Sequence, residues 1–138
     1  MTHLLDTSAL LAHYLAEPGA ERVQALFEDE TVVTGTSILA LFEFELRLHQ
    51  LRADAATRAR ELSRYRVLLN EVVDVTEPVR SEAIRLRTSA TAHVAVMDVL
   101  IGATASLQNA TLVHRDPHFA AIPATLLKQE FLPAKGPL

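Results

Sequence analysis

Two patterns of hydrophobic and polar residues follow one another along the chain. Short apolar or β-branched runs alternate with longer segments whose apolar residues recur at helical spacing. Runs such as HLL and VV are continuous rather than alternating, which indicates strands that are buried on both faces. The short runs predict strands at residues 3–6, 31–34, 72–75, 111–114 and 126–131.

The longer segments predict helices that separate these strands. They cover residues 7–16, 18–29, 37–50, 55–69, a segment opening at 76–78 and a segment from 94 or 96 to 108, with a short helical turn after residue 116. Strands that alternate with helices indicate an α/β fold, a parallel sheet covered on both faces. The two long helices that meet near Asp54 predict a helical hairpin inserted after the second strand.

The composition is that of one globular domain. The chain has 138 residues, of which 49% are hydrophobic and 22% are charged, with no internal repeat or long linker. We assign residues 1–132 to the domain and expect residues 133–138 to form a frayed tail. No apolar run is long enough to span a membrane, and the N-terminus lacks a basic leader, so we expect a cytoplasmic protein without membrane association.

Charge is unevenly distributed, although the net charge is only −4. Between residues 47 and 66 the sequence has six arginines and two acids, a local charge of +4. The forked arginine side chain suits RNA phosphates, and Arg58, Arg60 and Arg64 are the candidates for such a patch. A solvated helical face is the alternative interpretation.

Two acids directly follow predicted strands. Asp6 follows the first strand in LLDTSALL, and Asp116 follows a later one in TLVHRDPHF, just before Pro117. Either residue can be explained as a helix N-cap. Because ligands of parallel sheets bind beyond the carboxyl ends of the strands, both acids are also placed for chemistry at one edge.

Two further acids lie within apolar helices. Asp98 is the only charged residue in VAVMDVLIGATA, and burying its carboxylate costs several kcal/mol without compensation. A helix dipole supplies at most about 2 kcal/mol, which is less than this cost. A protonated Asp98 or a buried pair could resolve the cost, but a divalent cation shared with other acids does so more generally. Glu43 lies in SILALFEFELRL, where a solvated side chain is the alternative; Glu45 points to roughly the opposite side.

Gathered carboxylates favour Mg²⁺ or Mn²⁺, which prefer oxygen ligands and activate water against phosphodiesters. The sequence has no cysteine, which excludes disulfides, thiolate metal sites and a cysteine nucleophile. It also lacks GxxxxGK[ST], GxGxxG, HExxH and GxSxG. A metal-dependent hydrolase of phosphodiesters is therefore the favoured class.

The four acidic segments resemble, in order, those of the PIN-domain ribonucleases. The segments are LLDTSALLA, the SxxxxxE pattern from Ser37 to Glu43, MDVLIGATA and LVHRDPHFAAIP. The chain length and the helical hairpin are similar to the VapC-type toxins of type II toxin–antitoxin pairs. The resemblance implies a small α/β/α sandwich, Mg²⁺- or Mn²⁺-dependent cleavage of RNA, a homodimer and silencing by a cognate antitoxin.

The resemblance also implies a role for each acid. Asp6 and Asp98 would bind the metal directly, Asp116 would bind it directly or through water, and Glu43 would orient a water molecule or act as base. Thr7, Ser8, His114 and Arg115 are candidates for contacts with substrate or water.

The sequence departs from the family pattern at two places. His114 stands where relatives often carry Thr or Ser, and the segment TSATAHVAVMD lacks the Gly or Pro often found before the third acid. His93, His114 and His118 are candidates for contacts with RNA or for proton donation, with packing or a surface position as the alternative. The sequence does not indicate the RNA target. Tyr14, Tyr65 and Phe119 are candidates for base stacking, with core packing as the alternative.

Other functions are compatible with the same residues. A housekeeping RNA-processing PIN nuclease would share the acids, as would a catalytically inactive PIN scaffold that acts as a binding subunit. A phosphatase of a different α/β fold is disfavoured, because Asp6 is followed by Thr7 and Ser8 rather than by the second acid of a DxD motif.

Overall fold

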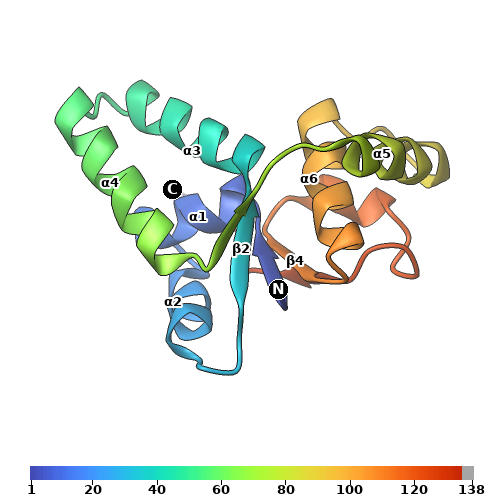
Figure 1. Ribbon diagram of the computed structural model, residues 1–138, viewed down its shortest axis with the longest axis horizontal. Helices are drawn as coiled ribbons and strands as arrows, with labels where there is room; N and C mark the ends of the chain where they lie inside the picture. The colour runs from blue at the N-terminus through green and yellow to red at the C-terminus, as the bar shows by residue number, and fades with distance from the viewer. Residues whose placement is uncertain (135–138) are drawn as a thin grey trace.

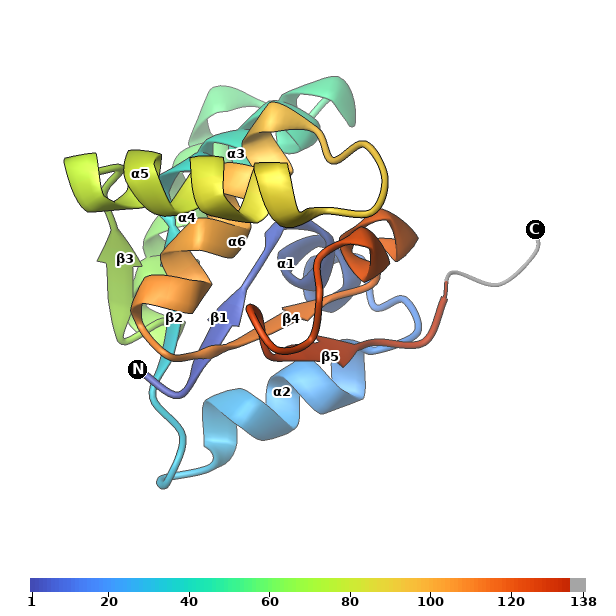
Figure 2. The same ribbon diagram turned by 90° about the vertical axis from the view of Figure 1, so that its right-hand side faces the viewer.

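A computed structural model describes residues 1–134. Its five strands form one parallel sheet in the order β3-β2-β1-β4-β5 (Figures 1 and 2). The strands are β1 (His3–Leu5), β2 (Thr34–Ser37), β3 (Glu71–Val73), β4 (Thr111–His114) and β5 (Gln129–Phe131). The predicted α/β fold with a short parallel sheet is confirmed. Of the predicted tail, residues 135–138 lie outside the described residues.

Helices cover both faces of the sheet, as Figure 1 shows. The helices are α1 (Thr7–Tyr14), α2 (Ala20–Glu28), α3 (Ile38–Gln50), α4 (Ala55–Leu68), α5 (Glu77–Ser89) and α6 (Val96–Leu107), with the 3-10 turn η1 (Pro117–Ala121) before β5. Helices α3 and α4 form the predicted hairpin after β2. Asp54 caps α4 by accepting a hydrogen bond from the Thr57 N–H at 2.7 Å. No helix of residues 1–134 is both long and apolar enough to cross a membrane.

The core is divided by the sheet into two layers. Leu4 of β1 and Leu112 of β4 pack toward α5 and α6, whereas their neighbours Leu5 and Val113 pack toward α1 to α4. All four side chains are fully buried. This burial on both faces explains why the strands read as continuous apolar runs.

The second strand lies three residues later than predicted. The sequence pattern predicted a strand at residues 31–34, but β2 is Thr34–Ser37, a polar segment that is buried throughout. Its polar groups are paired: Thr36 Oγ1 donates to the Leu5 carbonyl at 2.7 Å, and the Thr34 N–H donates to Asn70 Oδ1 at 2.9 Å. Burial of satisfied polar side chains leaves no hydrophobic signal, so the prediction was wrong here.

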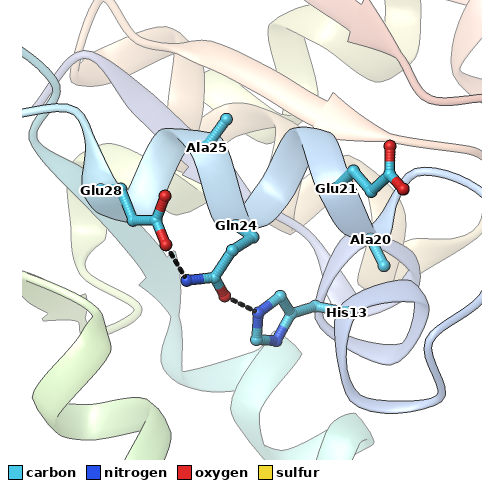
Figure 3. Close-up of a pocket in the computed structure, with 6 residues that line it drawn as sticks. All are labelled: His13, Ala20, Glu21, Gln24, Ala25 and Glu28. Carbon is cyan, nitrogen blue, oxygen red and sulfur yellow. Dashed lines mark hydrogen bonds between the residues drawn. The ribbon is translucent and has the colours of Figure 1, made fainter.

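A chain of side-chain hydrogen bonds joins α4 to α1 and α2. Figure 3 shows the part that runs from His13 through Gln24 to Glu28. The Gln24 oxygen can only accept, so His13 Nε2 donates to it at 2.7 Å, and His13 Nδ1 accepts from the Tyr65 hydroxyl at 2.6 Å. Gln24 in turn donates to Glu28 at 2.8 Å. His13, Gln24 and Glu28 line a pocket of about 340 Å³ on α2. The hydrogen bond between Tyr65 and His13 holds the hairpin of α3 and α4 against α1.

The strand order reverses beside β1. The chain runs from β1 outward through β2 to β3, and then returns to place β4 and β5 on the other side of β1. In parallel sheets such a reversal opens a crevice at the carboxyl ends of the two strands. Asp6 and Asp116 come shortly after β1 and β4, at the crevice.

Candidate active site

Asp6 is held rigidly at the end of β1. Its Oδ1 atom accepts hydrogen bonds from the Ala9 N–H at 3.0 Å and from the Ser8 hydroxyl at 2.6 Å, so the residue is the N-cap of α1. Only 4% of the residue is exposed. Both hydrogen bonds use the same oxygen, and no group within residues 1–134 donates to Oδ2.

Asp116 repeats this arrangement at the neighbouring strand. Its Oδ1 atom accepts from the backbone N–H of His118 at 2.9 Å and from His118 Nδ1 at 2.8 Å, and it caps η1. Here too Oδ2 receives no hydrogen bond from the described residues. Because capping uses only one oxygen of each carboxylate, Asp6 and Asp116 can each cap a helix and still offer the other oxygen to a ligand.

Glu43 approaches from α3. Its Oε1 atom accepts a hydrogen bond from the Thr7 hydroxyl at 2.8 Å, which fixes this long side chain against the start of α1. Glu45, two residues along α3, is exposed and lies on another face of the helix. The contact with Thr7 therefore distinguishes Glu43 from Glu45 as the acid that faces the crevice.

Asp98 lies in the first turn of α6 and is half-buried. Within residues 1–134 its carboxylate has neither a hydrogen bond nor a salt bridge, and no side chain caps the start of the helix. The described residues therefore give the negative charge of Asp98 no direct partner, although nearby His118 favours its ionised form.

The pKa values show that the acids influence one another. Burial, together with the charges of Asp98 and Asp116, raises the pKa of Asp6 to about 7, against the hydrogen bonds from Ser8 and Ala9. Burial, followed by the charges of Asp116 and Glu43, raises the pKa of Asp98 to about 6. Mutual repulsion of this kind is what a divalent cation relieves.

The donor set fits a hard divalent cation. Asp6, Asp116 and Glu43 each keep one carboxylate oxygen without a donor, and Asp98 keeps both. No three acidic or histidine side chains of residues 1–134 are close enough together to enclose an ion as they stand. Mg²⁺ does not need such a cage, because it keeps several waters and is held by one or two carboxylates.

Ser8 and Arg115 connect the two capped acids. The Ser8 hydroxyl donates to Asp6 and accepts from the backbone N–H of Arg115 at 3.0 Å. The Arg115 guanidinium points elsewhere, donating to Glu17 at 3.1 Å in a largely buried pair. Ser8 thus sets the spacing between the loop after β4 and the start of α1, whereas the Arg115 side chain supports the α1–α2 connection.

His114 is fully buried, so a direct contact with substrate is closed to it. Its Nδ1 atom accepts from the Asp116 N–H at 3.1 Å, which leaves Nε2 protonated to donate to Gln129 at 2.8 Å. Burial lowers the pKa of His114, consistent with this neutral form. His114 therefore acts on the acids only through the backbone of Asp116.

Comparison with known proteins decides the family. Residues 3–124 match the PIN domain family. The chain belongs to the PIN domain family. No curated protein matches its sequence significantly.

Solved structures confirm the PIN fold. VapBC2 from Rickettsia felis bound to a promoter DNA fragment is similar with a TM-score of 0.77 and 21% identity, over 96% of this chain and 100% of that one. VapBC-1 from nontypeable Haemophilus influenzae gives 0.74 and 18% identity, over 95% and 98%. Mycobacterium tuberculosis VapC20, a sarcin–ricin loop cleaving toxin, gives 0.67 and 18%, over 87% and 94%.

The arginines of the PIN domain's hairpin differ in how they are paired. Arg64 donates to Glu61 at 2.8 Å and lies over the Tyr65 ring, and Arg60 is 4.0 Å from the same Glu61. Arg58 instead donates to the Ala53 carbonyl at 2.6 Å. It lines a pocket of about 420 Å³ at the hairpin tip with Arg52 and His49. Within residues 1–134 neither Arg52 nor Arg58 forms a salt bridge, although Asp54 lies near enough to Arg58 for the two charges to interact.

The aromatic candidates chosen from the sequence are not surface platforms in this PIN domain. Tyr65 and Phe119 are fully buried, and Tyr14 packs edge-on against Phe44. The exposed aromatic beside the acids is Phe42, 60% exposed and adjacent to Glu43. Sequence reasoning missed Phe42 because apolar residues surround it in the same helix, and only the packing of α3 reveals which of them faces solvent.

Proposed function

We propose that this PIN domain is a divalent-metal-dependent endoribonuclease that hydrolyses RNA phosphodiester bonds. One observation carries the proposal: the charges of Asp98 and Asp116 act on Asp6, those of Asp116 and Glu43 act on Asp98, and within residues 1–134 each of the four carboxylates keeps at least one oxygen without a hydrogen-bond donor. A scaffold without catalysis has no need for such costly, uncompensated acids.

Asp6 and Asp98 would hold Mg²⁺ or Mn²⁺ through oxygens that have no donor within residues 1–134, and Asp116 would bind the ion directly or through water. When bound, the cation supplies charge stabilisation at the phosphate and makes water easier to deprotonate. Glu43, held by Thr7, would orient the attacking water and take its proton at Oε2. Water adds to phosphorus as the ester P–O bond breaks, and the departing oxygen takes up a proton.

We further propose that the protein is a VapC-type toxin. The proposal is supported by its similarity across the whole chain to solved VapBC and VapC structures. A toxin of this type would be a homodimer and would be silenced by a cognate antitoxin. The exposed Phe42 and Leu46 of α3 give an apolar surface beside Glu43 that such a partner would cover.

The RNA substrate would extend from the acids toward the hairpin. Arg58, Arg60 and Arg64 are proposed to contact its phosphates, with Arg58 contributing most because it forms no salt bridge with an acid of residues 1–134. The tip lies beyond the carboxyl half of α3. Glu43 and Gln50 are seven residues apart, about 10 Å along a helix and on one face.

The experiment is to map RNA 5′ ends in cells before and after the protein is induced. An endoribonuclease produces new ends at defined positions, and induction of Asp98→Asn does not. The same ends in both cultures, or none in either, would contradict the proposal and favour a binding scaffold. A toxin also arrests growth unless a co-expressed neighbouring gene relieves it, whereas a housekeeping nuclease does not.

A further inference from the structure

A pocket of about 340 Å³ lies beside the candidate site. It is formed between the loop at residues 90–95 and η1, and its polar lining includes Thr91, His93 and His118. The 90–95 loop leads directly into α6, where Asp98 is the third residue, and η1 directly follows Asp116. The two walls of the pocket are thus continuous with two of the four acids.

The walls of the pocket are fixed to each other. The Thr91 backbone N–H donates to the Ala121 carbonyl at 2.9 Å, and the Thr91 hydroxyl donates to the same oxygen at 3.4 Å. These contacts tie the loop before α6 to the end of η1. The pocket is therefore formed before any ligand binds.

The hydrogen bonds define what each imidazole offers to a ligand. Arg87 can only donate, so His93 Nδ1 accepts from it at 2.9 Å and the proton of neutral His93 is on Nε2. His118 Nδ1 donates to Asp116 at 2.8 Å, which leaves Nε2 of neutral His118 as an acceptor. Within residues 1–134 neither Nε2 atom has a hydrogen-bond partner.

We propose that this pocket binds the base of the nucleotide next to the scissile phosphate and gives the enzyme its sequence preference. The inference rests on the proposed RNA cleavage, because it places the phosphate at the acids. A donor at His93 and an acceptor at His118 match the edge of a nucleobase, which carries both kinds of group. At about 340 Å³ the pocket is near the lower limit of small-molecule sites, a size that suits one base.

A base fits the pocket better than a second phosphate does. The lining has no lysine or arginine, and the nearby Arg87 donates to His93. Phosphate recognition relies on cationic donors such as arginine. Imidazole rings and small residues, including Ala92 and Ala120, instead leave room for a flat ring.

The first test is an NMR titration of the metal-free protein with the four nucleoside monophosphates and with ribose 5-phosphate. At least one monophosphate should shift the His93 and His118 imidazole signals and the Thr91 amide, whereas ribose 5-phosphate should not. Equal shifts with ribose 5-phosphate, or none with any monophosphate, would overturn the proposal. Because binding is observed without cleavage, this result stands apart from the proposed nuclease activity.

Two variants identify the pocket as the place of binding. Ala120→Leu should fill it and abolish the shifts, and His93→Ala should weaken binding about tenfold, the effect of one lost hydrogen bond. Ala124→Leu is the matched control, because Ala124 is exposed and lines a different pocket, with Ser106 and Asn109 at the far end of α6. Wild-type binding by both Ala120→Leu and His93→Ala would overturn the proposal.

The second test reads sequence preference directly. Wild-type protein and the two pocket variants are incubated with a randomised RNA library, and the cleaved ends are sequenced. The preference at one nucleotide next to the cut should flatten in Ala120→Leu and His93→Ala and persist in Ala124→Leu. Unchanged preferences at every position would overturn the proposal. Absence of all RNA cleavage alongside intact nucleotide binding would count against the nuclease and not against the pocket.

Discussion

The Nδ1 atom of buried His114 accepts a hydrogen bond from the backbone N–H of Asp116 at 3.1 Å. On its other side the ring donates to Gln129 at 2.8 Å, and Gln129 donates to the Phe119 carbonyl at 3.0 Å. The ring also packs against Phe119 and Phe131, with centroids 4.6 and 4.4 Å away. His114 therefore fixes the backbone that carries Asp116 without reaching the crevice.

Two substitutions of His114 should separate this positioning role from simple packing. In His114→Asn the amide oxygen lies near the position of Nδ1 and preserves the acceptor, whereas in His114→Gln the amide lies near Nε2 and preserves only the contact with Gln129. Loss of a group that orients a metal ligand weakens binding by about 10- to 100-fold. Calorimetric titration with Mn²⁺ should therefore show a large loss in His114→Gln and a small one in His114→Asn. Equal affinities at similar melting temperatures would contradict the role.

Thr7 should matter through its hydrogen bond to Glu43. Thr7→Val keeps the shape of the side chain but removes the donor, so Glu43 loses its fixed orientation. We expect the cleavage rate to fall roughly tenfold with little change in RNA affinity, since a positioned general base contributes about 10²–10⁴-fold. Thr7→Ser retains the hydroxyl and serves as the control. If Thr7→Val cleaves as fast as Thr7→Ser does, the contact is irrelevant to catalysis.

The stability of the metal-free protein should depend on Asp6 between about pH 4 and pH 7. Because burial raises the pKa of Asp6 from 3.8 to about 7, the folded state binds the proton more tightly than the unfolded state does. The free energy of unfolding therefore falls as the pH rises through this range. Asp6→Asn, which keeps the capping oxygen, removes that contribution.

Urea denaturation in the presence of a chelator, from pH 4 to pH 8, measures the effect. The advantage of Asp6→Asn over wild type should grow with pH and level off above about pH 7. The control is Asp29→Asn, which changes an exposed acid near the opposite end of the sheet. Its stability advantage over wild type should not grow with pH. A constant difference between Asp6→Asn and wild type at every pH would contradict the raised pKa.

The hairpin arginines should contribute unequally to RNA binding. Arg52→Gln with Arg58→Gln removes two tip charges that form no salt bridge within residues 1–134, whereas Arg60→Gln with Arg64→Gln removes two charges that share a salt bridge with Glu61. Fluorescence anisotropy at several salt concentrations should show the larger loss of affinity and the flatter salt dependence in the tip pair. If both pairs match wild type, the arginines form a solvated face.

The sequence predicted the features that follow from hydrophobic periodicity and from the residues at the ends of strands. Continuous apolar runs marked β1 and β4, and the acids directly after them followed from the rule for parallel sheets. The pattern missed β2, because Thr34–Ser37 is buried with its polar groups satisfied by Leu5 and Asn70, which are distant in sequence. Tertiary pairing of this kind is invisible to local hydrophobicity.

The finer features of the site depend on tertiary contacts that the sequence pattern does not reveal. Which oxygen of Asp6 and Asp116 serves the cap, and which stays unpartnered, depends on contacts with Ser8 and His118. The burial of His114 and the exposure of Phe42 likewise depend on the packing of β4 and α3. Sequence patterns identified candidate residues. Their burial and contacts in the structure distinguish residues that can touch a ligand from residues that only position others.

The central claim is that the uncompensated acids bind a divalent cation and thereby hydrolyse RNA, and Asp98 tests it most directly. The measurement is cleavage of labelled RNA by highly purified wild-type protein and Asp98→Asn across a Mn²⁺ titration, with Asp29→Asn as the control. We predict cleavage that requires Mn²⁺ in wild type and the control, and at least a hundredfold loss in Asp98→Asn, because one of the few carboxylates that bind the metal is gone. Without metal, Asp98→Asn should melt no lower than wild type, because burial and the neighbouring acids disfavour the charged carboxylate. Wild-type cleavage by Asp98→Asn, or cleavage by wild type that persists in a chelator, would contradict the account.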